Sequence, residues 1–215
     1  MFRITESKKL MKKTFENLPV EKKQRILQAC IYEFGEHGYD GSSTDRIIKK
    51  AGISKGGLYE YISSKEELFL YTVEYTYTLL YDYLKIRIAD EGKELPPDLL
   101  NRLKLIADIA IDFYMDHPQV VYLIVRIANL SNEEIEEKSR ETFRRHFLEL
   151  FGDVEIGTLN HPKEQILELA MWMLLKTRMD FLLEIKTERD PEKIKEDYRN
   201  NWDFYLAILK NGIYR

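Results

Sequence analysis

The residues best suited to a chemical role lie in the short run Ser54-Lys55-Gly56-Gly57-Leu58-Tyr59-Glu60-Tyr61. Lys55 is a cation that can neutralise a phosphate or donate to the edge of a guanine. Each glycine at the start of a helix costs about 1 kcal/mol of helix propensity relative to alanine. A helix shaped by stability alone would avoid them, whereas a helix whose backbone approaches DNA phosphates closely tolerates them. The run therefore predicts a contact with DNA.

A second short helix is predicted immediately before this run, over residues 44–51. Ser43 or Thr44 can cap its N-terminus, and a tight glycine-containing turn follows it. Ser54 can then cap the next helix, which ends near Tyr61. Two short helices joined in this way are typical of the helix-turn-helix motif, whose second helix lies in the major groove.

The rest of the chain is also predicted to be helical, because apolar residues recur at helical spacing and no strand-like alternation of useful length is present. Capping residues, glycines and prolines set the expected ends. The sequence predicts an all-α fold of about nine helices: 18–34, 44–51, 54–61, 65–90, 98–116, 118–130, 131–151, 162–186 and 190–209.

Charge is distributed unevenly along the chain. The net charge of −4 alone argues against a nucleic-acid binder. However, residues 1–70 carry 13 Lys/Arg against 10 Asp/Glu, and residues 71–215 carry 20 against 27. A basic front on an acidic body suits a protein with one DNA-facing part. Residues 1–17 are basic and form either a DNA-touching arm, a short helix or a solvated tail, of which we expect the tail.

Composition excludes several other classes of protein. Cys30 is the single cysteine, so no internal disulfide and no zinc site of several thiolates can form, and its place on an apolar stripe predicts a buried thiol. Neither a signal peptide nor a membrane-spanning run is visible, which makes the cytoplasm the expected location and a membrane an unexpected partner. We expect no cofactor and no metal.

The segment around these two helices resembles the DNA-binding domain of the TetR (TetR/AcrR) family of bacterial transcriptional regulators. The resemblance is carried by FGEHGY at 34–39, by Ser43, Thr44 and Ile47, and by KAGISKGGLYEYISSKEEL at 50–68. It covers about fifty residues, from Leu18 to Leu68, in matching order and spacing.

The resemblance implies an all-helical homodimer in which a DNA-binding domain is followed by a ligand-binding and dimerisation domain. Residues 18–66, preceded by a basic arm at 1–17, would form the three-helix DNA-binding domain. Residues 67–215 would form a larger domain that binds a small molecule and dimerises, usually through its last two helices. Effector binding would then move the two DNA-binding domains out of register with successive major grooves.

Several DNA contacts are carried over from the family onto matching positions. Thr44 resembles the hydroxyl residue that caps its helix and touches a phosphate. Lys55 and Gly56 resemble contacts at the start of the recognition helix, and Lys65 resembles the phosphate-binding lysine that opens the next helix.

The remaining carried-over positions are aromatic. Tyr59 and Tyr61 resemble a pair that reaches a base edge and the DNA backbone, although with Leu58 between them the three side chains cannot all face one way. Ile62 stands where the family usually has phenylalanine. Glu60 occupies a variable position, and its carboxylate either accepts from a cytosine amino group or faces solvent.

The C-terminal half indicates a ligand cavity only through its composition. Tyrosines, methionines and tryptophan along its helices would line a site for an apolar ligand, or simply form the core. Phe113, Trp172 and Arg178 are the candidate ligand-binding residues. The last two predicted helices are rich in apolar residues on more than one side, as expected for a four-helix dimer interface.

Other functions find little support in the motifs. The sequence has no nucleotide-binding glycine loop, no GxSxG and no HExxH, and its four histidines are scattered, so an enzyme is not expected. A helical interaction protein without a DNA role remains the alternative. The sequence predicts a ligand-responsive regulator, most simply a repressor released from a palindromic operator by a small apolar or amphipathic effector, although the sign of regulation is not encoded.

Overall fold

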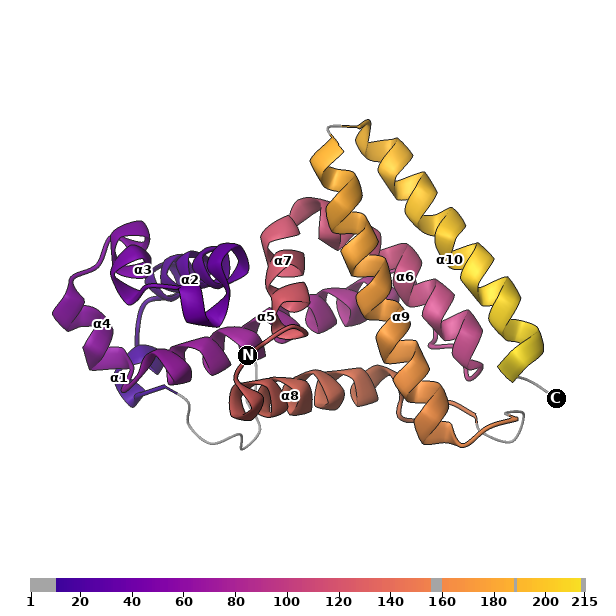
Figure 1. Cartoon of the computed structure of the whole chain (residues 1–215), viewed down its shortest axis with the longest axis horizontal. Coiled ribbons are helices and arrows are strands. Elements are labelled where there is room, and N and C mark those ends of the chain that lie inside the picture. The colour runs from indigo at the N-terminus through magenta and orange to yellow at the C-terminus, as the bar shows by residue number, and fades with distance from the viewer. Residues whose placement is uncertain (1–10, 156–159, 188, 214–215) are drawn as a thin grey trace. The chain divides into compact units, whose positions relative to one another are not determined.

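The computed structural model describes residues 11–155, 160–187 and 189–213, and every regular element within these ranges is helical (Figure 1). The all-α prediction is therefore confirmed. The elements are α1 (Lys13–Glu16), α2 (Val20–Gly41), α3 (Thr44–Ala51), α4 (Lys55–Tyr61), α5 (Lys65–Asp90), α6 (Leu99–Asp116), α7 (Pro118–Ile127), α8 (Glu133–Phe151), α9 (Lys163–Glu184), the 3₁₀ turn η1 (Ile185–Thr187) and α10 (Pro191–Ile213).

Most predicted helix ends agree with the structure to within two residues, but α7 ends at Ile127 rather than at 130, and α10 continues to Ile213 rather than ending at 209. The helical assignment of α2 continues past Gly35 to Gly41, and the chain changes direction at Gly38, whose φ of 68° is the left-handed conformation that glycine adopts freely. Helix α8 begins at Glu133 rather than at 131, and it is capped by Asn132, whose Oδ1 accepts from the Ile135 N–H at 3.0 Å.

The chain divides into two compact units. The first comprises residues 1–77 and 122–142, and the second comprises 78–121 and 143–215. Helices α5, α7 and α8 therefore each contribute residues to both units. The first unit contains the predicted helix-turn-helix, and the second contains α6, α9 and α10.

The core of the first unit is built on the apolar stripe of α2. Phe34 is fully buried and meets Phe69 of α5 edge-on at a ring-centroid distance of 5.0 Å. Cys30 lies on the same stripe, and burial raises the pKa of its thiol to about 12. The thiol is therefore protonated at neutral pH and acts as a small apolar side chain, as predicted.

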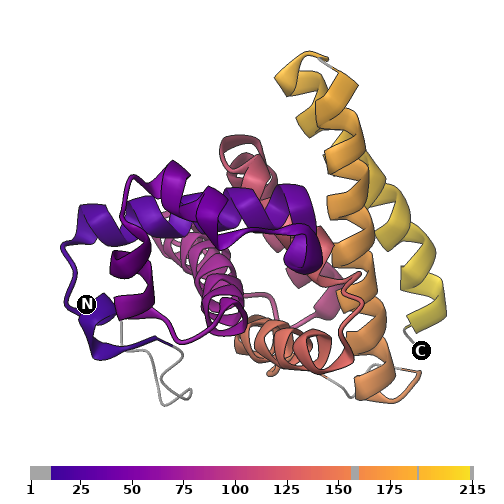
Figure 2. The same ribbon diagram turned by 60° about the vertical axis from the view of Figure 1, so that its left-hand side comes forward.

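The second unit is organised around α6, α9 and α10. Trp202 of α10 and Phe181 of α9 are almost fully buried, and α9 and α10 run side by side in both views (Figures 1 and 2). The guanidinium of Arg102 is also buried and donates to the Leu150 carbonyl at 2.7 Å, which caps the end of α8. Among the described residues, no helix is both long and apolar enough to cross a membrane.

Candidate DNA-binding surface

Helices α3 and α4 form the predicted helix-turn-helix. Gly52 ends α3 in the left-handed conformation, with φ 64° and ψ 42°, which places the chain in a tight turn. Ser54 then caps α4, because its Oγ accepts from the Gly57 N–H at 3.1 Å. The turn and the cap of α4 are those that the sequence predicts. The predicted cap of α3 was wrong, because Ser43 at the N-cap makes no side-chain capping bond and Thr44 is already the first residue of the helix.

Packing fixes which face of α4 is available for contact. Leu58 is fully buried with Ile47 of α3, while Ile53 in the turn is half-buried. The opposite face carries Tyr59, which is 42% exposed, next to the exposed Glu60. One side of α4 thus belongs to the core and the other faces solvent.

Three of the predicted contact residues gather on this exposed side. The Oγ1 of Thr44 lies 3.4 Å from the hydroxyl oxygen of Tyr59. The ammonium of Lys55 lies 3.1 Å from a carboxylate oxygen of Asp45, and this hydrogen bond raises the pKa of Lys55. The exposed surface of α3 and α4 therefore presents the ammonium group of Lys55 and the two hydroxyl groups of Thr44 and Tyr59.

Gly56 adds an open stretch of backbone to this surface. A Cβ built at Gly56 would meet no atom within 4 Å, so packing within the protein does not require glycine there. At Gly57, by contrast, a Cβ would approach the capping Oγ of Ser54 to 3.1 Å. Packing within the fold therefore gives no reason for glycine at position 56.

Tyr61 lies apart from the other predicted contacts. Its side chain is 6% exposed, its ring packs against Phe15, and its hydroxyl accepts from the Lys22 ammonium at 3.1 Å. Residues three apart on a helix share a face, so Tyr61 follows Leu58 into the core while Tyr59 turns outward. The buried ring of Tyr61 is therefore not available for a direct contact with a base.

Lys65 is engaged by the protein itself. Its ammonium donates to the carbonyls of Tyr39 at 2.7 Å and Ser42 at 3.3 Å, and it lies over the Tyr39 ring. These carbonyls close the end of α2, where a cation is favourable. A phosphate contact by Lys65 would have to use its remaining donor.

The carboxylate of Glu33 was not anticipated and organises the start of α3. It is almost fully buried and accepts from the Ser43 N–H and from the Arg46 Nε, each at 2.8 Å. Burial alone would raise the pKa of Glu33, but these hydrogen bonds outweigh it and lower the pKa. The signal in the sequence was an acidic residue within the apolar stripe of α2, three residues after Cys30.

Arg46 of α3 is also engaged by α2. Besides its bonds to Glu33, it donates to the Gly41 carbonyl at 2.6 Å. It is therefore neither a purely solvated side chain nor an unengaged phosphate contact. Lys50 of the same helix lies over the ring of Tyr32, 3.2 Å from its centroid.

The segment before α2 differs from the expected solvated tail. Phe15 in α1 is fully buried, and its ring contacts those of Tyr61 and Tyr71. The expectation was wrong for residues 12–17, since a four-residue helix carries no periodicity to reveal its buried side. Residues 1–10, including the basic Arg3, Lys8 and Lys9, lie outside the described range.

The candidate ligand-binding residues fall into two places in the second unit. Phe113 is buried and contacts the ring of Tyr114, and Arg178 is buried with its Nε donating to the Tyr114 hydroxyl at 2.8 Å. Trp172 is instead 60% exposed on α9. The structure therefore brings Phe113 and Arg178 together through Tyr114 and leaves Trp172 on a different surface.

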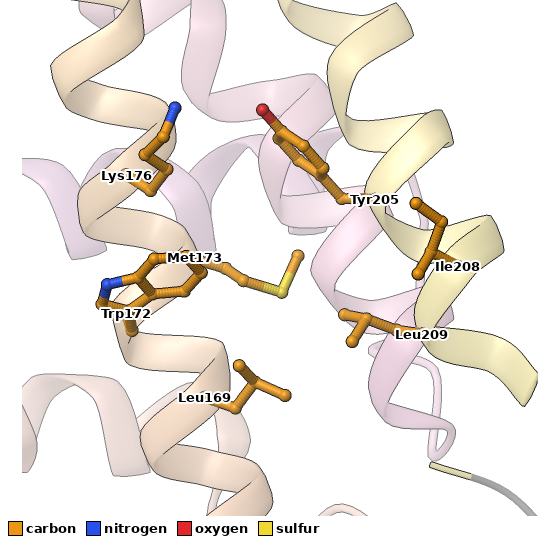
Figure 3. Close-up of a pocket in the computed structure, with 7 residues that line it drawn as sticks. All are labelled: Leu169, Trp172, Met173, Lys176, Tyr205, Ile208 and Leu209. Carbon is orange, nitrogen blue, oxygen red and sulfur yellow. The ribbon is translucent and has the colours of Figure 1, made fainter. Parts of the chain in front are cut away.

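Trp172 borders an open apolar groove formed by α9 and α10. In Figure 3, side chains of the two helices face one another across this groove. Its lining residues are Leu169, Trp172, Met173, Lys176, Tyr205, Ile208 and Leu209. Within the described residues, no group of three or more His, Cys, Asp or Glu is placed to hold a metal ion.

Comparison with known proteins agrees with this geometry. Residues 26–72 match the family model for bacterial regulatory proteins of the tetR family. The biofilm operon negative transcriptional regulator IcaR of Staphylococcus epidermidis is 37% identical over 87 residues, which span 40% of this chain and 46% of that regulator. The uncharacterised regulator YhgD of Bacillus subtilis is 22% identical over 175 residues, which span 81% of this chain and 89% of YhgD.

Solved structures extend the likeness to the whole fold. A TetR family transcriptional regulator from Chloroflexus aurantiacus superposes with a TM-score of 0.63 at 20% identity, covering 95% of this chain and 99% of that one. The regulator FadR of Bacillus subtilis, solved in complex with stearoyl-CoA, gives a TM-score of 0.64 at 15% identity, covering 83% and 96%. Residues 26–72 thus belong to the DNA-binding domain of the tetR family of bacterial regulatory proteins, and the chain as a whole has the fold of TetR family transcriptional regulators.

Proposed function

We propose that the chain is a ligand-responsive, sequence-specific transcriptional regulator, most simply a repressor, that reads a palindromic operator with α4. The observation that carries the proposal is the exposed face of α4. There Lys55 and Tyr59 flank a glycine whose missing side chain has no cause within the fold. A cation, hydroxyls and open backbone suit phosphates and base edges in a major groove.

A two-fold dimer would give this surface its operator spacing. In the single chain, α9 and α10 expose several large apolar side chains to solvent. Those at least 42% exposed are Trp172, Met179, Leu183, Phe204 and Ile208. Exposed apolar residues concentrated on two adjacent helices are typical of an interface. Two copies of this helix pair would form a four-helix bundle, and two half-sites about 34–36 Å apart would match the dimer.

The effector we propose is a small apolar or amphipathic molecule bound in the second unit. Aromatic rings surround the buried guanidinium of Arg178, which lies over the rings of Tyr114 and Phe143. Such a setting suits a ligand with an apolar body and one polar or anionic group. Stearate and stearoyl-CoA are suitable first probes, and the proposal expects at least one compound of this class to release the operator.

The DNA-reading role is tested by two substitutions on α4. Lys55→Ala and Tyr59→Ala should each abolish specific operator binding while leaving a folded protein of unchanged oligomeric state, because both side chains are exposed. Lys93→Ala, which removes an exposed cation from the other unit, is the charge-matched control. Wild-type operator binding by both α4 variants would show that the surface is assigned wrongly.

A further inference from the structure

The recognition helix is poorly equipped to hold itself in place. Helix α4 has seven residues, and two of its first three are glycines. Isolated helices of this length are unstable, and the last four carbonyls of any helix have no partner within it. The orientation of α4 must therefore depend on contacts from outside the helix.

The segment that precedes α2 provides those contacts. Of the four terminal carbonyls of α4, only the first bonds to the chain that directly follows the helix, and residues 12 and 14 bond to the other three. The Ile62 N–H donates to the Leu58 carbonyl at 3.2 Å, and the Lys12 N–H donates to the Tyr61 carbonyl at 3.0 Å. The side chains of Lys12 and Thr14 donate to the carbonyls of Tyr59 and Glu60, through Nζ at 2.9 Å and Oγ1 at 2.6 Å.

This segment is itself firmly anchored. The fully buried ring of Phe15 packs between those of Tyr61 and Tyr71, at centroid distances of 5.9 and 5.4 Å. The carboxylate of Glu16 accepts from the Tyr71 hydroxyl at 3.2 Å and from Lys23 at 3.3 Å. The segment therefore links α4 to the start of α2 and to α5, and it can transmit their rigidity.

We propose that Lys12 and Thr14 are positioning residues for DNA reading: they hold the end of α4, and with it Tyr59, in a fixed orientation. This inference rests on the proposed reading of DNA by α4. It gives Lys12 a role distinct from that of a basic arm, because its ammonium donates to the carbonyl of the residue that reads the DNA. If Lys12 only contacted a DNA phosphate, a neighbouring lysine could make that contact in its place.

The neighbouring Lys13 provides the matched control. Lys12→Met and Lys13→Met remove the same charge from adjacent exposed positions, but only Lys12 donates to α4. Thr14→Val removes the hydroxyl that reaches Glu60, and Thr14→Ser keeps it. Each full-length variant is measured on operator DNA, on random duplex DNA at several salt concentrations, and by amide exchange without DNA.

The double variant Lys12→Met/Thr14→Val should lose about tenfold or more in operator affinity, as expected when two hydrogen bonds are lost. Its affinity for random DNA should fall no further than that of Lys13→Met, because phosphate contacts carry non-specific binding. Amides of α4 should exchange faster in the double variant and not in Lys13→Met. Thr14→Ser should retain wild-type operator affinity.

Three results would overturn the inference, and they are distinguishable from one another. Unchanged exchange of the α4 amides would show that the segment does not hold the helix, whether or not α4 reads DNA. Faster exchange with unchanged operator affinity would show that DNA reading does not depend on the segment that holds α4, and this inference would fail. The proposed function would fail with it only if Lys55→Ala and Tyr59→Ala also bind the operator like wild type. Equal losses for Lys12→Met and Lys13→Met on both DNAs would reduce Lys12 to a phosphate cation.

Discussion

At the scale of single residues, charged side chains that are already paired decide how the DNA-binding surface is built. The buried carboxylate of Glu33 in α2 accepts hydrogen bonds from the Ser43 N–H, just before α3, and from the Arg46 Nε within α3. Lys65 and Arg46 donate to carbonyls near the end of α2. Basic side chains that are candidates for phosphate contacts thus also hold α2, α3 and α5 together.

Replacing Glu33 by alanine should destabilise the protein at neutral pH by about 1–3 kcal/mol, because buried donors lose their acceptor. The pKa of Glu33 is lowered in the folded state, so its stabilisation is complete above the unfolded value of about 4.3. It is lost as pH falls through the lower folded value. Denaturant unfolding at pH 7 and pH 3 measures this difference.

Glu36→Ala is the control for that experiment, since it removes the same charge from an exposed position on the same helix. It should change the free energy of unfolding by less than about 0.5 kcal/mol. A Glu33→Ala protein that is equally destabilised at both pH values would contradict the ionised, hydrogen-bonded carboxylate.

Asp45→Asn should strengthen DNA binding. The substitution removes the carboxylate that pairs with Lys55 and also removes a negative charge near the DNA. Because exposed ion pairs contribute little to stability, the fold should be unaffected. Binding measured across salt concentrations should be tighter at low salt and steeper in its salt dependence by up to about one unit of slope. Unchanged affinity would place Lys55 away from the phosphates.

At the scale of elements, local signals predicted the helices that depend on local interactions. Ser54 caps α4, and Asp98 caps α6 by accepting from the Asn101 N–H. The sequence also identified the outward Tyr59 and the unusual Gly56. It could not predict that Tyr61 is covered by Phe15, because that contact joins residues far apart in the chain.

The same limit explains the two features of the site that were missed. Helix α1 exists because Lys12 and Thr14 reach carbonyls 46 or 47 residues later, and no periodicity of a four-residue helix records this. Glu33 was missed for the same reason, because its partners Ser43 and Arg46 lie 10 and 13 residues later in the chain.

Gly56→Ala should separate stability from function in α4. Alanine has room at this position and favours helix by up to about 1 kcal/mol, so the melting temperature should rise. Operator affinity should fall about tenfold or more, because the methyl group would stand between the backbone and the DNA. Gly212→Ala in α10, where a Cβ also has room, is the matched control and should leave DNA binding unchanged. Wild-type operator affinity in Gly56→Ala would argue against close backbone approach.

At the scale of the whole molecule, the proposed dimer links the apolar faces of α9 and α10 to operator recognition. Phe204 is 60% exposed on α10. Phe204→Glu should shift the protein to monomers at micromolar concentration and weaken operator binding, whereas Phe204→Leu should remain dimeric. Sedimentation velocity with parallel DNA titrations measures both effects. A Phe204→Glu dimer of wild-type strength would place the interface elsewhere.

The most direct test of the central claim is a binding selection on random duplex DNA, followed by affinity measurements on the recovered sequence at several salt concentrations. The proposed function predicts an enriched palindrome with half-sites about one helical turn apart, bound by a dimer with strong salt dependence. Folded protein, purified without bound effector, that enriches no sequence would contradict sequence-specific reading by α4 and would favour a helical interaction protein.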